Sequence, residues 1–251
     1  MSMRAGEVTG MSGIDRTCHG DVPQEDFEPR LPIFLLADSK PLFRSAFGGF
    51  VLGSLRRVLP QKAKAAYLGA SNGDDPAFYS IFEAAMDAIE ITERRMITSA
   101  YSDAERAFLS DAHLVLLSGG DVARGWDVFT RTGMRDTIIE RLSAGALCVG
   151  VSAGAVQLGL QGWREKSDGA DCVFDTFQVV PRIIDVHDEA GDWRRLRARL
   201  RAHQGQVRGL GIPFGGVVVY YPDGRLKVQG RAAVELSCQR GEFGMTEIAP
   251  T

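Results

Sequence analysis

Short apolar runs recur along the chain, and amphipathic segments separate them. A run without polar interruptions is typical of a strand that is buried on both faces of a sheet. The clearest example is Leu114-Val115-Leu116-Leu117-Ser118, which two glycines follow directly. Strands are expected at residues 32–37, 64–69, 94–98, 114–118 and 146–151.

The segments between these runs place apolar residues at helical spacing. Ser102 and Glu105 form a capping box, which is typical of a helix start, and Gly133 is expected to kink a long helix. Helices are expected at residues 46–59, 76–89, from 102 onward, 122–143 and 153–160. Strands and helices that alternate in this way predict a three-layer, flavodoxin-like α/β fold with helices on both faces of a mostly parallel sheet.

The two ends of the chain differ from this middle part. After residue 170, extended runs are expected at 177–184 and 207–221, with a helix at 193–203 between them, so the C-terminal part is predicted to be strand-rich. Residues 1–30 are polar, mixed in charge and without period. We expect a flexible N-terminal extension there, followed by a single domain over residues 31–251.

Composition and charge exclude several classes of protein. The 251 residues include 29 basic and 32 acidic side chains, a net charge of −3, and no basic block that would favour nucleic acid. No apolar run is long enough for a membrane span, and the first residues lack the apolar stretch of a signal peptide. The four scattered cysteines have no zinc-ligand spacing and indicate no disulfide framework. We therefore expect a cytoplasmic protein without metal, cofactor, nucleic-acid or membrane partner.

The strongest chemical signal is Gly150-Val151-Ser152-Ala153-Gly154, at the end of a predicted strand and the start of a predicted helix. This G-x-S-x-G pattern in a strand-turn-helix context predicts a nucleophile elbow. The two glycines allow the backbones to approach, and the tight turn exposes the Ser152 hydroxyl. The Ala153 N–H, at the positive end of the helix, can donate to an oxyanion. The alternative is a glycine-rich turn with an incidental serine.

A second glycine motif ends the neighbouring strand. The sequence Ser118-Gly119-Gly120-Asp121 follows the apolar run at 114–118. Because carboxyl ends of adjacent parallel strands share one crevice, an N–H of Gly119 or Gly120 is expected to be the second oxyanion donor.

A nucleophilic serine needs a base, and the chain has four histidines. His19 lies in the expected extension, His113 precedes a strand at the opposite edge of the sheet, and His203 lies in an arginine-rich helix. His187 follows an extended run and opens a polar loop, so elimination favours it. A surface loop residue without catalytic function is the alternative.

Taken together, these segments resemble peptidase family S51, which includes dipeptidase E (aspartyl dipeptidase) and cyanophycinase. The resemblance covers roughly residues 31–235 and rests on four motifs: Leu116-Leu117-Ser118-Gly119-Gly120-Asp121, Gly150-Val151-Ser152-Ala153-Gly154-Ala155, Ile184-Asp185-Val186-His187 with Arg194-Arg195-Leu196, and Gly209-Leu210-Gly211-Ile212. It implies a class I glutamine amidotransferase-like fold in which serine replaces the amidotransferase cysteine.

The resemblance also implies the roles of individual residues. Ser152 would be the nucleophile and His187 the general base, and Gly120 and Ala153 would line the oxyanion hole. The residues that would shape the pocket for an acidic peptide are Asp185 and Arg194 or Arg195. A solvated helix face is the alternative for the arginines.

This chain departs from the family pattern at the third catalytic residue. Cyanophycinase-like sequences carry an acidic residue just after the Gly-x-Gly-Ile stretch, where this chain has Pro213-Phe214. Asp185, Asp188 and Glu189 are the candidates to orient His187 instead.

The sequence thus predicts a serine-type exopeptidase or amidohydrolase that cleaves a small peptide, at an aspartyl or isoaspartyl linkage if it follows the family. The alternatives are an S51-like pseudoenzyme that binds a peptide or partner, and an esterase. Whether two copies pair as a homodimer is left open.

Overall fold

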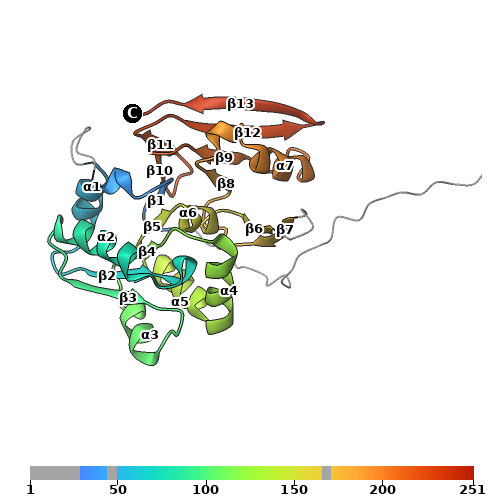
Figure 1. Ribbon diagram of the computed structural model, residues 1–251. Helices are drawn as coiled ribbons and strands as arrows, with labels where there is room; N and C mark the ends of the chain where they lie inside the picture. The colour runs from blue at the N-terminus through green and yellow to red at the C-terminus, as the bar shows by residue number, and fades with distance from the viewer. Residues whose placement is uncertain (1–28, 44–49, 166–170) are drawn as a thin grey trace, which may run out of the picture.

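The computed structural model describes residues 29–43, 50–165 and 171–251, which form two sheets, a separate hairpin and the helices around them (Figure 1). The larger sheet has seven strands in the order β11-β10-β1-β5-β4-β2-β3. Its strands are β1 (Ile33–Leu36), β2 (Lys64–Leu68), β3 (Glu93–Ile97), β4 (Leu114–Leu117), β5 (Leu147–Val151), β10 (Val217–Tyr220) and β11 (Leu226–Gln229).

Five neighbouring strands of this sheet, β1, β5, β4, β2 and β3, are parallel. The two remaining strands, β10 and β11, extend the β1 edge in antiparallel pairs. Strands β1, β4 and β5 are buried at every position, as their uninterrupted apolar sequences predict. The expected mostly parallel sheet is confirmed, and the carboxyl ends of β1, β4 and β5 lie side by side.

Helices cover both faces of the sheet, as predicted. A first core lies under α1 (Phe50–Val58) and α2 (Pro76–Asp87). A second core, on the opposite face, contains residues of α3 (Asp103–Ser110), α4 (Val122–Thr132), α5 (Met134–Ser143) and α6 (Ala153–Gln157), and also of α7 (Arg194–Ala202).

Local sequence signals explain where several helices begin and end. Ser102 and Glu105 form the predicted capping box before α3. Gly133 adopts a left-handed φ of 75° between α4 and α5, so the expected kink is a break between two helices.

The C-terminal part is strand-rich, as expected. It contains a four-stranded sheet in the order β13-β12-β9-β8, against which α7 (Arg194–Ala202) packs. The strands are β8 (Ile183–Val186), β9 (Gly209–Ile212), β12 (Ala233–Gln239) and β13 (Glu242–Ile248). The extended run expected at 177–184 becomes a strand only from Ile183, and the hairpin of β6 (Gln161–Glu165) and β7 (Asp171–Asp175) was not predicted.

Three further expectations concern the N-terminal extension, membrane-spanning helices and the cysteines. The N-terminal extension lies, except for residues 29 and 30, outside the described residues. Among the helices that the structure describes, none combines the length and apolar character that a bilayer span requires. Cys148 and Cys238 are free and buried, whereas Cys172 is disulfide-bonded, so the expectation of no disulfide is wrong for Cys172.

Candidate active site

Ser152 lies at the turn between β5 and α6, where the sequence predicts a nucleophile elbow. Its backbone has φ 50° and ψ −109°, a conformation that residues other than glycine rarely adopt. The Ser152 N–H donates to the carbonyl oxygen of Leu36, at the end of β1, over 2.8 Å. The strained turn is therefore fixed to the neighbouring strand, and the hydroxyl faces a cavity.

Two glycines make this turn sterically possible. A Cβ atom on Gly154 would overlap the carbonyl oxygen of Leu117 in β4, and one on Gly150 would lie 2.6 Å from the Gly154 carbonyl oxygen. The elbow helix thus packs directly against two strands. The glycines of the G-x-S-x-G motif serve close backbone approach, as the sequence predicts.

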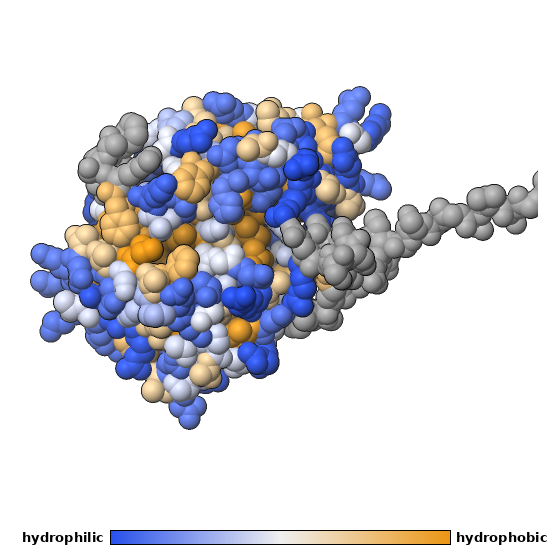
Figure 2. Space-filling model, viewed as in Figure 1, coloured by the Kyte–Doolittle hydropathy of each residue, from blue (hydrophilic) through white to orange (hydrophobic). Residues whose placement is uncertain are grey.

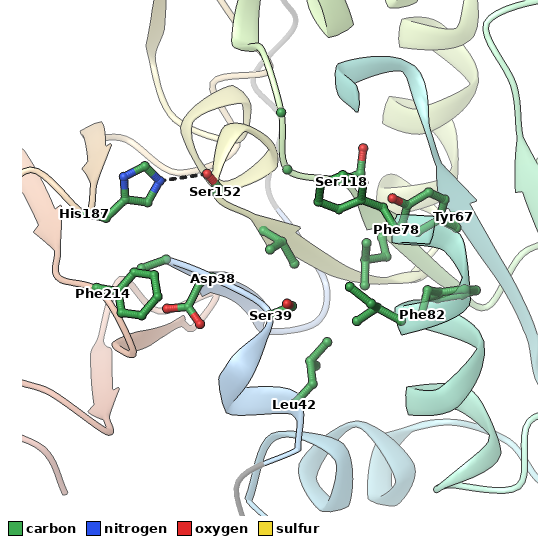
Figure 3. A pocket seen from close by; sticks show the side chains of 16 residues that line it. Asp38, Ser39, Leu42, Tyr67, Phe78, Phe82, Ser118, Ser152, His187 and Phe214 are labelled. Atoms are coloured by element: carbon green, nitrogen blue, oxygen red, sulfur yellow. Dashed lines mark hydrogen bonds between the residues drawn. The ribbon is translucent and has the colours of Figure 1, made fainter. Parts of the chain in front are cut away.

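His187 reaches Ser152 from the other sheet. It follows β8 and is 35 residues from Ser152 in sequence, yet its Nε2 lies 2.9 Å from Ser152 Oγ (Figure 3). The His187 N–H donates to the Ile212 carbonyl oxygen over 2.9 Å, which fixes the backbone beside β9. The hydroxyl and the imidazole are within the distance that general-base activation requires.

The other histidines have different surroundings. His113 Nδ1 accepts a hydrogen bond from the Lys64 N–H, and His203 Nε2 lies 3.0 Å from Gln161 Oε1. His19 lies outside the described residues. The histidine that elimination favoured is the one that the structure places beside Ser152.

No carboxylate among the described residues hydrogen-bonds to His187. Glu189 Oε1 instead accepts from the Phe214 N–H over 3.2 Å and lies 3.3 Å from Arg231. Asp188 Oδ2 and Glu189 Oε2 are buried without hydrogen-bond partners in the described structure. Ser152 and His187 therefore form a dyad, because no acid among the described residues hydrogen-bonds to the ring.

Asp185 lies in β8, two residues before His187, and not in the cavity. It is 4% exposed, its Oδ1 accepts from the Val186 N–H, and among the described residues its Oδ2 has no partner. Burial, and secondarily the nearby Asp188 carboxylate, raises the pKa of Asp185 to about 6. This buried carboxyl does not line the cavity, so the predicted role of Asp185 in shaping the pocket is not supported by its position.

The predicted oxyanion donors surround Ser152. A Cβ built on Gly119 would lie 3.3 Å from Ser152 Cβ, which places the glycine pair next to the nucleophile. Gly120 has a φ of 134°, and a Cβ there would overlap the Ser71 carbonyl oxygen. Within the described part of the chain, the N–H groups of Gly119, Gly120 and Ala153 donate to no protein acceptor. These amides are available to an oxyanion.

A cavity of about 460 Å³ opens beside the dyad. It is lined mainly by apolar side chains, among them Leu42, Phe78, Ile81, Phe82, Leu116 and Phe214. Figure 3 shows Phe214 and Asp38 on the side of His187, with Phe78 and Phe82 across the cavity. Across the residues that the structure describes, no group of three or more His, Cys, Asp or Glu side chains could hold a metal ion.

Two of the predicted pocket residues lie elsewhere. Arg194 and Arg195 are exposed on α7 and do not line the cavity. Sequence reasoning missed Asp38 and Phe214, which do line it. Asp38 follows β1, a neighbour of β5, so the rule about carboxyl ends of adjacent strands could have found it. Phe214 comes shortly after β9, where the family resemblance would place an acidic residue, so its position near the site was indicated but its part in the cavity lining was not.

Comparisons with known proteins agree with this architecture. The chain resembles the crystal structure of a peptidase from an acI-B1 Actinobacterium, with a TM-score of 0.66 and 16% identity over 87% of this chain and 94% of that one. It also resembles a peptidase E-like protein from Listeria monocytogenes EGD-e, with a TM-score of 0.57 and 16% identity over 80% and 98% of the two chains. No curated protein matches the sequence.

A match to a family model identifies the family of this chain. The model of peptidase family S51 matches residues 60–227, which include the Gly119-Gly120 pair, the Ser152 elbow and His187. This match covers more than half of the 251 residues. The chain therefore belongs to peptidase family S51.

Proposed function

We propose that this S51 family member is a serine-type exopeptidase or amidohydrolase that cleaves small peptides through an acyl-enzyme. The observation that carries the proposal is the 2.9 Å separation of Ser152 Oγ and His187 Nε2 at the edge of a cavity. The free amides of Gly119, Gly120 and Ala153 beside them supply the second requirement of acyl transfer, a site for the oxyanion.

In the first half-reaction, His187 Nε2 accepts the Ser152 hydroxyl proton as Oγ attacks the peptide carbonyl carbon. The carbonyl oxygen becomes an oxyanion, which accepts hydrogen bonds from Ala153 and the glycine pair. The imidazolium then protonates the amide nitrogen, the C–N bond breaks, and the amine product leaves an ester on Ser152.

In the second half-reaction, His187 Nε2 accepts a proton from water as the water oxygen attacks the ester carbonyl. The proton returns to Ser152 Oγ when the ester bond breaks, and the acid product is released. Every proton in the cycle thus passes through one imidazole, and no other cosubstrate than water is needed.

The size of the cavity supports a small substrate. A volume of about 460 Å³ lies at the lower end of small-molecule pockets, which span roughly 300–1,000 Å³. The aspartyl or isoaspartyl linkage that the family resemblance implies stays a prediction. No arginine or lysine among the described residues lines the cavity to receive an acidic side chain.

Peptide hydrolysis tests the proposal. Purified protein is incubated with a panel of dipeptides, and released amino acids are quantified by mass spectrometry beside Ser152→Ala and His187→Ala variants. Release that requires both residues would support the proposal. Release that survives in Ser152→Ala would contradict it.

A binding protein without turnover is the second candidate. The observation in its favour is that, among the described residues, no carboxylate orients His187. In that case the folded protein would hydrolyse none of the dipeptides, and the cavity would serve to bind a peptide.

A further inference from the structure

Exposed large apolar side chains are concentrated in the cavity beside the dyad. Six large apolar side chains are exposed in the described residues, and three of them, Phe78, Ile81 and Phe214, line this one cavity. Their exposed fractions are 47%, 36% and 43%. Figure 2 shows hydrophobic residues gathered around a hollow on the face in view. Apolar surface that is clustered in a concavity marks a ligand site, because a ligand that covers it releases its hydration water.

The deeper walls of the cavity are apolar as well. Phe82 from α2 and Leu116 from β4 are 2% and 3% exposed, and Leu42 from η1 (Lys40–Leu42) is 5% exposed. Phe78 and Ile81 are three residues apart on α2, so they lie on one face of that helix. A side chain that enters between α2 and η1 therefore meets carbon atoms on several sides.

Among the described residues, Asp38 is the one carboxylate that lines the cavity. It directly follows the strand next to Ser152, and its position is fixed by two backbone donors. Oδ2 accepts from the Gly215 N–H over 2.6 Å, and Oδ1 accepts from the Lys40 N–H over 2.9 Å. A held carboxylate at the side of the cavity favours a cationic group of the ligand.

The two features fit the N-terminal residue of a peptide. Such a residue carries an ammonium group, a side chain and the scissile carbonyl around one Cα atom. With the carbonyl at Ser152, the ammonium can approach Asp38 on the His187 side while the side chain extends toward Phe78 and Phe82 across the cavity (Figure 3). An endopeptidase substrate would lack the ammonium that Asp38 is placed to receive.

We propose that the site prefers peptides with an apolar N-terminal residue of the size of Leu or Phe, and that Asp38 binds the free α-ammonium group. This inference rests on the proposed peptidase function. An acidic side chain in the same place would lose its hydration without gaining a cationic partner among the described residues that line the cavity. Lys40, whose Nζ lies 4.4 Å from the centre of the Phe214 ring, does not line the cavity.

Steady-state kinetics on four dipeptides tests the side-chain preference. The values of kcat/KM for Leu-Gly and Phe-Gly are expected to exceed those for Asp-Gly and β-Asp-Gly by about 100-fold, the scale on which pocket complementarity discriminates. Equal or better hydrolysis of the acidic peptides would overturn this inference and leave the peptidase function intact. Hydrolysis of none of the four would overturn both.

A charge placed in the cavity sharpens the test. Ile81→Arg is expected to lower kcat/KM for Leu-Gly at least ~10-fold and to raise it for Asp-Gly, since a guanidinium pairs with a carboxylate. The matched control is Val58→Arg, which places the same side chain on an apolar residue that is 43% exposed and outside the cavity. If Ile81→Arg changed the Leu/Asp ratio no more than Val58→Arg does, the cavity would not hold the substrate side chain.

The role of Asp38 is tested with a neutral variant and a blocked substrate. Asp38→Asn keeps an oxygen that can accept from Gly215 but removes the charge. Its KM for leucine p-nitroanilide is expected to rise about 10-fold, on the scale of one lost charge-assisted hydrogen bond, while N-formyl-leucine p-nitroanilide, which lacks the ammonium, should be unaffected. An equal change for both substrates would contradict ammonium binding by Asp38.

Discussion

Ser152 and His187, the proposed catalytic pair, are held in place by different means. Ser152 belongs to the seven-stranded sheet, and its turn is fixed by a hydrogen bond to β1 and by the close approach of Gly154 to β4. His187 belongs to the segment after β8 in the four-stranded sheet, and among the described residues no carboxylate orients its ring. Ser152 is thus positioned by backbone packing, whereas the backbone of His187 is held beside β9 by a hydrogen bond to Ile212.

The largest effect is expected when the base is removed. His187→Ala should lower kcat about 10⁴-fold or more, because Ser152 then has no proton acceptor within reach. Circular dichroism would check that the variant is folded. A folded His187→Ala enzyme with kcat within 10-fold of the native value would show that another group serves as base.

At the Ser152 elbow, the addition of a single methyl group at Gly154 should strongly destabilise the fold. Gly154→Ala is expected to lower the free energy of unfolding by roughly 3 kcal/mol, because its Cβ would overlap the Leu117 carbonyl oxygen. Gly53→Ala is the control: a Cβ there meets no atom within 4 Å, and alanine favours a helix by about 1 kcal/mol. Urea unfolding measures both. Equal effects of the two substitutions would contradict close packing at the elbow.

Asp185, two residues before His187 in β8, should make stability depend on pH. Its folded pKa of about 6 exceeds the ordinary value of 3.8, so the folded state binds more protons between these values. Its contribution is therefore lost as pH rises through 6, and Asp185→Asn should gain up to about 3 kcal/mol relative to the native chain between pH 4 and pH 7.5. Denaturant unfolding of both proteins at these two pH values measures the gain. A difference independent of pH would contradict the raised pKa.

The smallest effects are expected for the acidic side chains next to His187. Asp188→Asn and Glu189→Gln should each change kcat by no more than about 10-fold, far less than the 10⁴-fold loss on removal of a true triad acid. Steady-state kinetics at fixed pH measures this. A loss of 10³-fold or more in either variant would identify that residue as the orienting acid and turn the dyad into a triad.

This contrast also explains what the sequence could and could not predict. The Ser152 elbow is local: one five-residue motif contains the strand end, the turn and both glycines, so pattern and packing agree. The approach of His187 depends on how two sheets meet, and elimination among four histidines could only favour it. The position of Asp38 in the site could have been predicted from the strand order. That order, with β1 beside β5, is itself a long-range feature.

The apolar lining was beyond sequence reasoning for a similar reason. Phe78 and Ile81 follow the helical pattern of α2, and a helix buries most such residues. Only the tertiary structure shows that these two are exposed in the cavity and that Arg194 and Arg195 are outside it. The β6–β7 hairpin was missed because its strands, Gln161–Glu165 and Asp171–Asp175, lack the uninterrupted apolar runs of the central sheet.

The central claim, that His187 activates Ser152, is tested most directly by covalent labelling. The native protein, Ser152→Ala and His187→Ala are treated with a fluorophosphonate, which reacts with activated serines, and their intact masses are measured. If His187 activates Ser152, the native protein carries one adduct and neither variant carries any. No adduct on folded native protein, or an adduct that persists in Ser152→Ala, would contradict this claim.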